Sequence, residues 1–351
     1  MNIDTNKPVM VTGANGYVAS WLVKRLLEEG LTVHAAVRNP SKTEKHAHLD
    51  AVAEKASGNI KYFAADLLTE GAYAEAMEGC QVVFHTASPF TLDVKDPQKD
   101  LIDPAVKGTA NVLNQANKVE SVERVVVTSS CAAIYCDAID TVNAPGGKLT
   151  EEVWNTTASL DYQPYSYSKT LAEKKAWEIA NAQDRWKLVT INPSFVMGPA
   201  LNATTTTSES YSVLKQMGDG SFKTGVPKLG AGVVDVRDVA EAHFQAGFNA
   251  NAQGRYITSA HNTNFYEMAQ TLLPKYGDKY PVPKKALPKW LLSLVGPMVN
   301  KAFSRSFIKK NVNVPWNADN SKIKKELGME FRPLQTTMED SFQVLIDNKM
   351  I

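Results

Sequence analysis

The sequence predicts an α/β protein: a doubly wound, parallel sheet of the Rossmann type, with a smaller, mainly C-terminal substrate-binding lobe. In the first half, short valine-rich segments alternate with amphipathic helical patterns, and the first such segment runs into a glycine-rich turn. This alternation is typical of parallel strands with helices on both faces of the sheet. With 351 residues and 44% hydrophobic content, the chain is long enough for a large core.

The alternation can be followed element by element as far as Pro193. Predicted strands cover 8–12, 32–37, 60–64, 81–86, 124–129 and 187–191, and predicted helices begin near 17, 41, 104 and 165. A return strand at 232–236 leads into a helix through 240–244. We therefore expect a dinucleotide-binding domain from 1–193 with 228–258, and a substrate lobe from 194–227 with 259–351.

The first turn carries small residues at three-residue spacing: Gly13, Gly16 and Ala19. Small residues let the backbone turn tightly and approach a pyrophosphate, which the N-terminus of the next helix attracts. The pattern therefore predicts a dinucleotide site. Its spacing differs from the G-x-G-x-x-G of dehydrogenases, and the alternative is a strand–helix turn without a ligand.

Arg38 follows the second predicted strand, and no Asp or Glu lies between Thr32 and Ser41. An acidic residue there would bind the ribose of NAD, whereas an arginine suits the 2′-phosphate of NADP. Lys42 and Lys45 add positive charge nearby. The segment therefore favours NADP; the alternative is a solvated loop of mixed charge.

Tyr165 and Lys169 are four residues apart on a predicted helix, so both side chains share one face. A neighbouring ammonium favours the phenolate of a tyrosine, which can then exchange a proton with a substrate oxygen. Ser129 and Ser130 end the fifth strand and offer a hydroxyl to hold that oxygen. The pair alone is also compatible with an ordinary helix surface. Together with the glycine turn, it predicts nicotinamide-dependent redox chemistry on a carbonyl or alcohol.

Composition narrows the partners and the compartment. The 38 basic and 37 acidic residues leave a net charge of +1, which suggests neither nucleic acid nor an anionic membrane. The first strand starts near Pro8 and leaves no room for a signal peptide, and the apolar stretch at 290–299 is too short to span a bilayer. Three cysteines form no metal-binding pattern. We expect a cytoplasmic protein without a metal, either a monomer or a homodimer.

From Pro8 to about Leu345 the chain resembles the extended short-chain dehydrogenase/reductase superfamily. The stretches that carry the resemblance include VTGANGYVASWLVKRLLEEG, VVVTSSCAAIY, YSYSKTLAEK and INPSFVMGP. More narrowly, the chain is similar to the branch of dihydroflavonol and cinnamoyl-CoA reductases and their aldehyde and ketone reductase relatives.

The resemblance implies a role for residues at the glycine turn and the strand ends. Ser130, Tyr165 and Lys169 match the catalytic triad of the superfamily, and 193–196 match its nicotinamide wall. The implied cofactor contacts are Thr12, Gly13, Asn15, Gly16, Tyr17, Val18, Arg38, Lys45, Asp66, Leu67, Ala87, Ser88, Thr128, Tyr165, Lys169, Pro193, Ser194 and Val196.

Five aromatic or apolar residues are candidates for the substrate pocket: Phe90, Tyr135, Tyr167, Met197 and Tyr211. The alternative for each of them is a place in the core. Tyr135 stands where plant dihydroflavonol reductases often carry a polar residue, which argues against a flavonoid substrate.

The expected function is the NADPH-dependent reduction of an aldehyde or ketone to an alcohol, on a small-molecule substrate. The first alternative is a nucleotide-sugar epimerase or dehydratase that keeps NAD bound. The second is a non-catalytic NADP sensor, against which the intact set of Ser130, Tyr165 and Lys169 argues.

Overall fold

The computed structural model describes residues 4–88, 94–204, 208–299 and 303–351. Its centre is a sheet of seven strands in the order β10-β6-β5-β4-β1-β2-β3, and every neighbouring pair is parallel. The strands are β1 (Val9–Thr12), β2 (Thr32–Val37), β3 (Asn59–Ala64), β4 (Val82–His85), β5 (Arg124–Thr128), β6 (Lys187–Pro193) and β10 (Gly254–Thr258). The predicted Rossmann-type sheet is confirmed.

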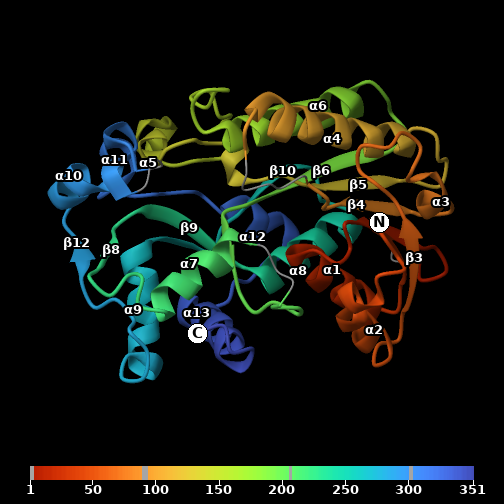
Figure 1. The fold of residues 1–351 in the computed structure, drawn as a ribbon. Helices are drawn as coiled ribbons and strands as arrows, with labels where there is room; N and C mark the ends of the chain where they lie inside the picture. The colour runs from red at the N-terminus through yellow and green to blue at the C-terminus, as the bar shows by residue number, and fades with distance from the viewer. Residues whose placement is uncertain (1–3, 89–93, 205–207, 300–302) are drawn as a thin grey trace.

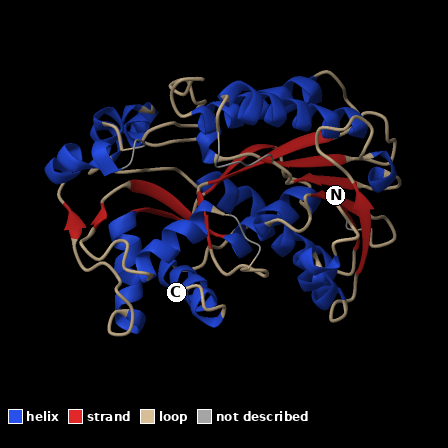
Figure 2. Cartoon of the chain, viewed as in Figure 1, coloured by secondary structure: helices blue, strands red, loops and turns tan. Residues whose placement is uncertain are grey.

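Helices cover both faces of this sheet, which explains why its central strands are mainly apolar, whereas the edge strand β3 is partly exposed (Figures 1 and 2). Every residue of β1 and β4 is buried. One face packs against α1 (Tyr17–Glu28), α2 (Ala47–Ala53), α8 (Val236–Phe248) and α12 (Ser321–Leu327). The other packs against α3 (Ala74–Met77), α4 (Asp103–Ala116) and α6 (Pro164–Asn181), with the π-helical turn η2 (Gln98–Ile102) leading into α4.

The smaller lobe is built around a second sheet, in the order β11-β9-β7. Its strands are β7 (Phe195–Met197), β9 (Gly230–Asp235) and β11 (His261–Asn264), and β8 (Val226–Pro227) pairs separately with β12 (Ala286–Leu287). The helices of the lobe are α7 (Glu209–Gly218), α9 (Phe265–Tyr276), α10 (Lys289–Val299), α11 (Arg305–Asn311) and α13 (Leu334–Asp347). Three short elements follow β5: η3 (Cys131–Ala133), α5 (Ala138–Asn143) and η4 (Pro145–Gly147).

The six strands predicted in the first half all occur within two residues of their predicted ends. Two differences concern 228–258. The return strand β9 lies in the small sheet, whereas β10, which was not predicted separately, forms the edge of the main sheet. The segment therefore contributes to both lobes. The helix predicted over 41–56 is broken into a 3-10 turn (Thr43–Lys45) and the short α2, since within α2 only Leu49 is buried.

No helix within the four described ranges is long and apolar enough to cross a membrane.

Candidate active site

The glycine turn is held against the end of β4 by Thr12. The buried Thr12 hydroxyl accepts the backbone N–H groups of Thr86 at 3.1 Å and Ala87 at 2.9 Å. It also lies 3.0 Å from Nδ1 of His85, whose pKa burial lowers to about 3, so that the ring is a neutral acceptor. Gly13 has φ +61°, and an added Cβ would lie 3.2 Å from Cα of Ala87. Only glycine therefore fits this close, left-handed turn.

Helix α1 begins at this turn and is tied to the small lobe at its first residues. Gly16 is its N-cap. The Tyr17 hydroxyl donates to the carbonyl of Gly198 at 2.7 Å, and the indole N–H of Trp21 donates to Pro199, also at 2.7 Å. The side chain of Tyr17 is thereby occupied. Its backbone N–H, with those of its neighbours at the helix start, remains the group suited to a phosphate.

The positive charge expected for a 2′-phosphate lies at the end of β2. Arg38 directly follows this strand and is exposed, and Lys45 is exposed in the next turn. Within the described ranges neither side chain makes an ion pair. Asp66 follows β3 and accepts the N–H of Leu68 at 2.9 Å. Leu67 packs so closely on α4 that a Cβ added to Gly108 would lie 2.5 Å from its Cγ.

Ser130 and Ser129 have different partners at the end of β5. Ser129 donates to the buried carboxylate of Glu173 at 2.5 Å. Ser130 is the N-cap of η3, where its oxygen accepts the N–H of Ala132 at 3.1 Å. This bond leaves the hydroxyl hydrogen of Ser130 free to donate to a substrate oxygen. Ser130 is therefore the better placed of the two.

Tyr165 lies in the first turn of α6, with Nζ of Lys169 5.9 Å from the centre of its ring. Although 40% of the residue is accessible, protein atoms surround it closely enough for desolvation to raise the pKa of its hydroxyl to about 12; the charge of Glu209 adds to this. The expected lowering of this pKa by Lys169 is not seen. The protein's own groups instead keep Tyr165 protonated at neutral pH.

Lys169 is 8% exposed and donates from Nζ to the Ser88 hydroxyl at 3.0 Å. Burial lowers the pKa of its ammonium to about 8, and the negative charge of Glu173 opposes this shift. Lys169 thus links α6 to the loop after β4, and it is charged at neutral pH although it is buried.

Glu173 was missed in the sequence, although it continues the face of Tyr165 and Lys169 by one more turn. Its carboxylate accepts from Nε of Arg255 at 2.7 Å and from the amide of Asn192 at 2.7 Å, in addition to Ser129. It therefore joins α6 to β5, β6 and β10. An acidic residue on the buried face of an amphipathic helix was the signal that could have identified it.

Thr128 and Ser194 lie at the ends of adjacent strands. The Thr128 hydroxyl is 2.6 Å from Nε2 of His243, whose Nδ1 is 2.7 Å from the Val239 carbonyl. Since burial lowers the pKa of His243 to about 4, the ring is neutral, Nδ1 donates and Thr128 donates to Nε2. The Ser194 hydroxyl is buried and has no hydrogen-bond partner among the residues that the structure describes.

These features test whether a dinucleotide fits. Gly13 leaves a cradle that a Cβ would fill, and the unpartnered Ser194 hydroxyl lies between Pro193, at the end of β6, and Val196 in β7. Both belong to the segments that the sequence assigned to the cofactor. The residues present therefore fit NADP.

The candidate pocket residues differ in how accessible they are to a substrate. Tyr135 packs edge-on against Trp316, with ring centroids 5.6 Å apart, and Tyr167 is half-buried on α6. Met197 and Tyr211 are 1% and 4% exposed within the core of the small lobe, which leaves little of either side chain to contact a substrate. Phe90 lies outside the described residues.

Comparison with known proteins places the chain in a family. Residues 9–257 match the NAD dependent epimerase/dehydratase family. A cinnamoyl-CoA reductase of Medicago truncatula is 38% identical over 97% of this chain and 96% of its own length. Among solved structures, Gre2 of Candida albicans in complex with NADPH has a TM-score of 0.78 and 29% identity, with 97% of this chain and 99% of that chain covered. The yeast methylglyoxal/isovaleraldehyde reductase Gre2, also complexed with NADPH, has a TM-score of 0.78 and 27% identity, over 98% and 100% of the two chains.

The chain therefore belongs to the NAD dependent epimerase/dehydratase family, and within it to the reductases similar to cinnamoyl-CoA and dihydroflavonol reductases. The resemblance seen in its motifs is confirmed. So is the expectation of an NADP-dependent oxidoreductase.

Proposed function

We propose that this protein reduces an aldehyde or ketone to an alcohol with NADPH, and that Ser130, Tyr165 and Lys169 carry the reaction. The observation that carries the assignment is the arrangement of α6. It presents a protonated tyrosine and a buried ammonium on one face, packed against the turn that Ser130 caps. A protonated tyrosine is the form that reduction of a carbonyl requires.

NADPH supplies a hydride to the carbonyl carbon when it is bound. Ser130 donates its free hydroxyl hydrogen to the carbonyl oxygen and fixes its position. Tyr165 gives its phenolic proton to the same oxygen as negative charge develops there. Solvent then returns the proton to Tyr165, while the buried Lys169 ammonium, which donates to Ser88, would contact the bound cofactor.

The cofactor would lie along the carboxyl ends of the main strands. The glycine turn and the first N–H groups of α1 would hold the pyrophosphate, with Arg38 and Lys45 on the 2′-phosphate. Asp66 and Leu67 would contact the adenine. Ser88 and Ser194 would offer further hydroxyls to the dinucleotide.

We also propose that 1–193 with 228–258 binds the cofactor and that 194–227 with 259–351 covers the substrate. Strand β9 is the exception in this division, because it belongs to the small sheet. Two apolar cores lie on either side of the main sheet, and a third, separate core lies in the small lobe. This separation supports the division into two lobes. A cytoplasmic location, and a monomer or homodimer, complete the proposal.

The substitution Tyr165→Phe tests the mechanism. It removes only the hydroxyl, so we expect turnover to fall by at least about 100-fold. NADPH affinity, measured by fluorescence titration, stays within about twofold, because the remaining contacts are retained. Ser129→Ala is the matched control, since Ser129 faces Glu173, and it keeps most of the turnover. Near-normal turnover in Tyr165→Phe would exclude this residue as the acid.

A further inference from the structure

Helix α10 presents an apolar face to solvent. Trp290, Leu294 and Met298 are 69%, 61% and 85% exposed, and their four-residue spacing aligns them in one stripe. Val295 beside them is 39% exposed. Of the eight large hydrophobic side chains exposed in the described residues, these four lie on one helix of 11 residues. Such a concentration marks an interaction surface, whereas single exposed hydrophobic residues are ordinary.

The opposite face of α10 is already packed. Leu292 is 7% exposed, and an added Cβ at Gly296 would lie 3.3 Å from Cδ1 of Ile308 in α11. The Ser293 hydroxyl donates back to the carbonyl of Lys289 at 2.9 Å and so adds little polarity. A helix that is apolar all round is normally covered on all sides. The outward stripe of α10 therefore lacks its cover in the described chain.

The surroundings of α10 are strongly basic. Residues 279–318 hold eight Lys and Arg and no Asp or Glu. The rest of the chain therefore contains 30 basic residues and all 37 acidic ones. Seven of the eight basic residues lie in the described ranges, and Lys279, Lys284, Lys285, Arg305 and Lys309 are exposed. The near-zero net charge, from which no anionic membrane was expected, thus conceals a sequence segment of formal charge +8, in which Lys310 is paired with Asp137 at 3.1 Å.

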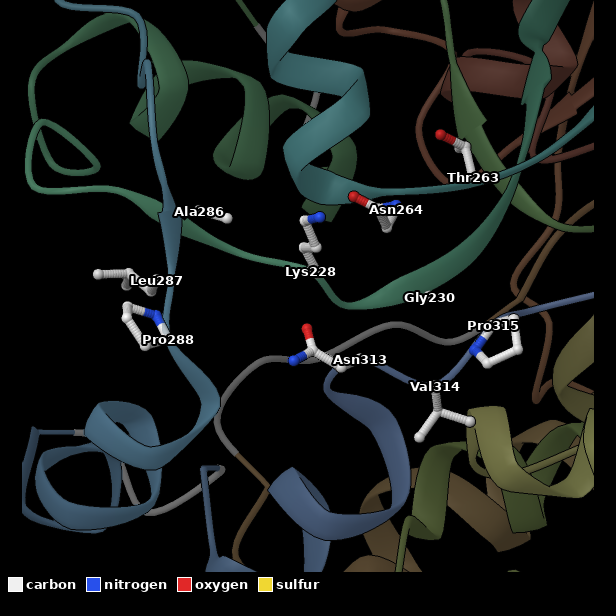
Figure 3. A pocket seen from close by; sticks show the side chains of 10 residues that line it. All are labelled: Lys228, Gly230, Thr263, Asn264, Ala286, Leu287, Pro288, Asn313, Val314 and Pro315. Atoms are coloured by element: carbon white, nitrogen blue, oxygen red, sulfur yellow. The ribbon is translucent and has the colours of Figure 1, made fainter.

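The same end of the molecule contains a groove of about 450 Å³ (Figure 3). It lies at the start of α10, where Leu287 and Pro288 form part of its apolar wall. Of the described residues that line it, Lys228 is the only charged one. Helices α10 and α11 and strand β12 lie together here, at the opposite end of the molecule from β3 (Figure 1). Apolar and basic surface therefore occur together, far from the outer edge of the cofactor domain.

We propose that this end of the small lobe docks on an anionic lipid bilayer. The stripe of Trp290, Leu294 and Met298 enters the boundary between headgroups and acyl chains, a region that tryptophan favours. Lysine and arginine around it bind the negative headgroups. With 11 residues, α10 is too short to cross a bilayer and lies on its surface.

A second copy of the chain is a poorer occupant. A two-fold contact places the same patch on both subunits, and here it would bring two segments of charge +8 together. A stable interface also buries about 800 Å² on each partner, more than four side chains provide. A negatively charged bilayer complements the same charge.

The test is co-sedimentation of the full chain with vesicles. We expect binding to phosphatidylcholine vesicles that contain about one third phosphatidylserine, little binding to phosphatidylcholine alone, and release when salt is raised from about 0.1 M to about 1 M. Trp290→Ser/Leu294→Ser/Met298→Ser and, separately, Lys284→Glu/Lys285→Glu should each lower the partition coefficient at least about tenfold. All five positions are exposed, so circular dichroism and NADPH oxidation in solution should be unchanged.

Matched controls separate a local patch from a general effect. Leu68→Ser removes a side chain that is 56% exposed after β3, and Lys55→Glu/Lys61→Glu changes the net charge equally. Both should bind vesicles like the parent. The proposal is overturned if anionic vesicles do not bind the protein, if neutral vesicles bind it equally, or if the controls lose binding as the patch variants do. It is also overturned if the triple variant changes only the oligomeric state, which would identify a second copy as the occupant.

Discussion

Arg38 is the residue that we propose decides between the two nicotinamide cofactors. It is exposed at the end of β2, and the chain has no Asp or Glu between Thr32 and Ser41 to bind a ribose hydroxyl. We expect Arg38→Ala to raise the KM for NADPH by about 10- to 100-fold, because a charge-assisted bond to phosphate is lost, and to leave the KM for NADH nearly unchanged. Steady-state kinetics with both cofactors measures the difference. Lys61→Ala serves as the control, and an equal rise in both KM values would assign Arg38 another role.

The burial of Lys169 predicts how the stability of the protein depends on pH. Its pKa is about 8 in the folded protein against an ordinary value of 10.5, so between these values the unfolded chain binds more protons. Stability therefore rises with pH across that window, and below pH 8 the buried ammonium costs up to about 3 kcal/mol.

Lys169→Met should accordingly increase the free energy of unfolding at pH 7 while it abolishes most of the turnover. This advantage should shrink as the pH rises from about 8 towards 10.5. Urea denaturation at several pH values measures it, with the exposed Lys118→Met as the control. A variant that is less stable than the parent at pH 7 would contradict the cost assigned to burial.

At the scale of elements, α6 carries the proposed reacting groups, Tyr165 and Lys169, and is itself held by Glu173. The side chain of Glu173 is fully buried and pairs with Arg255 of β10 at 2.7 Å. Removing one partner of a buried pair leaves the other charge uncompensated, so Glu173→Ala should cost about 3–5 kcal/mol of stability. It should also lower the pKa of Lys169 further, because Glu173 is the charge that opposes the lowering.

The measurement for Glu173 is thermal unfolding together with a pH–rate profile, whose alkaline limb should move to lower pH. The double variant Glu173→Gln/Arg255→Gln removes both charges of the pair and should therefore recover part of the stability. It should not return the alkaline limb of the profile to its original pH. If the alkaline limb does not move in either variant, Glu173 does not influence the pKa of Lys169.

Sequence patterns located the elements whose residue types are restricted by the backbone and by burial. The glycine turn was identifiable because only small residues allow its close approach to Ala87, and the central strands because burial on both faces makes them mainly apolar. The helical spacing of Tyr165 and Lys169 likewise placed them on one face. The direction of the pKa shift of Tyr165 could not be obtained this way, since the shift depends on burial and on Glu209, 44 residues away.

At the scale of the whole molecule, the two lobes are joined where the glycine turn begins α1. Tyr17 and Trp21 bind the carbonyls of Gly198 and Pro199, which follow β7 of the small sheet. No sequence pattern predicted these contacts, because they join segments about 180 residues apart. The small lobe was the harder part to predict for the same reason: strand β9 leaves the regular alternation and pairs with β7 and β11.

The most direct test of the central claim is NADPH oxidation by the purified protein against aldehydes, diketones, cinnamoyl thioesters and dihydroflavonols, with NADH in parallel and the product identified. We expect stoichiometric formation of the product alcohol (for a thioester, the aldehyde), a rate with NADPH well above that with NADH, and loss of product formation and NADPH oxidation in Tyr165→Phe. Tightly held NAD with isomerised sugar nucleotide and no net consumption of NADPH would contradict it and identify an epimerase on the same scaffold.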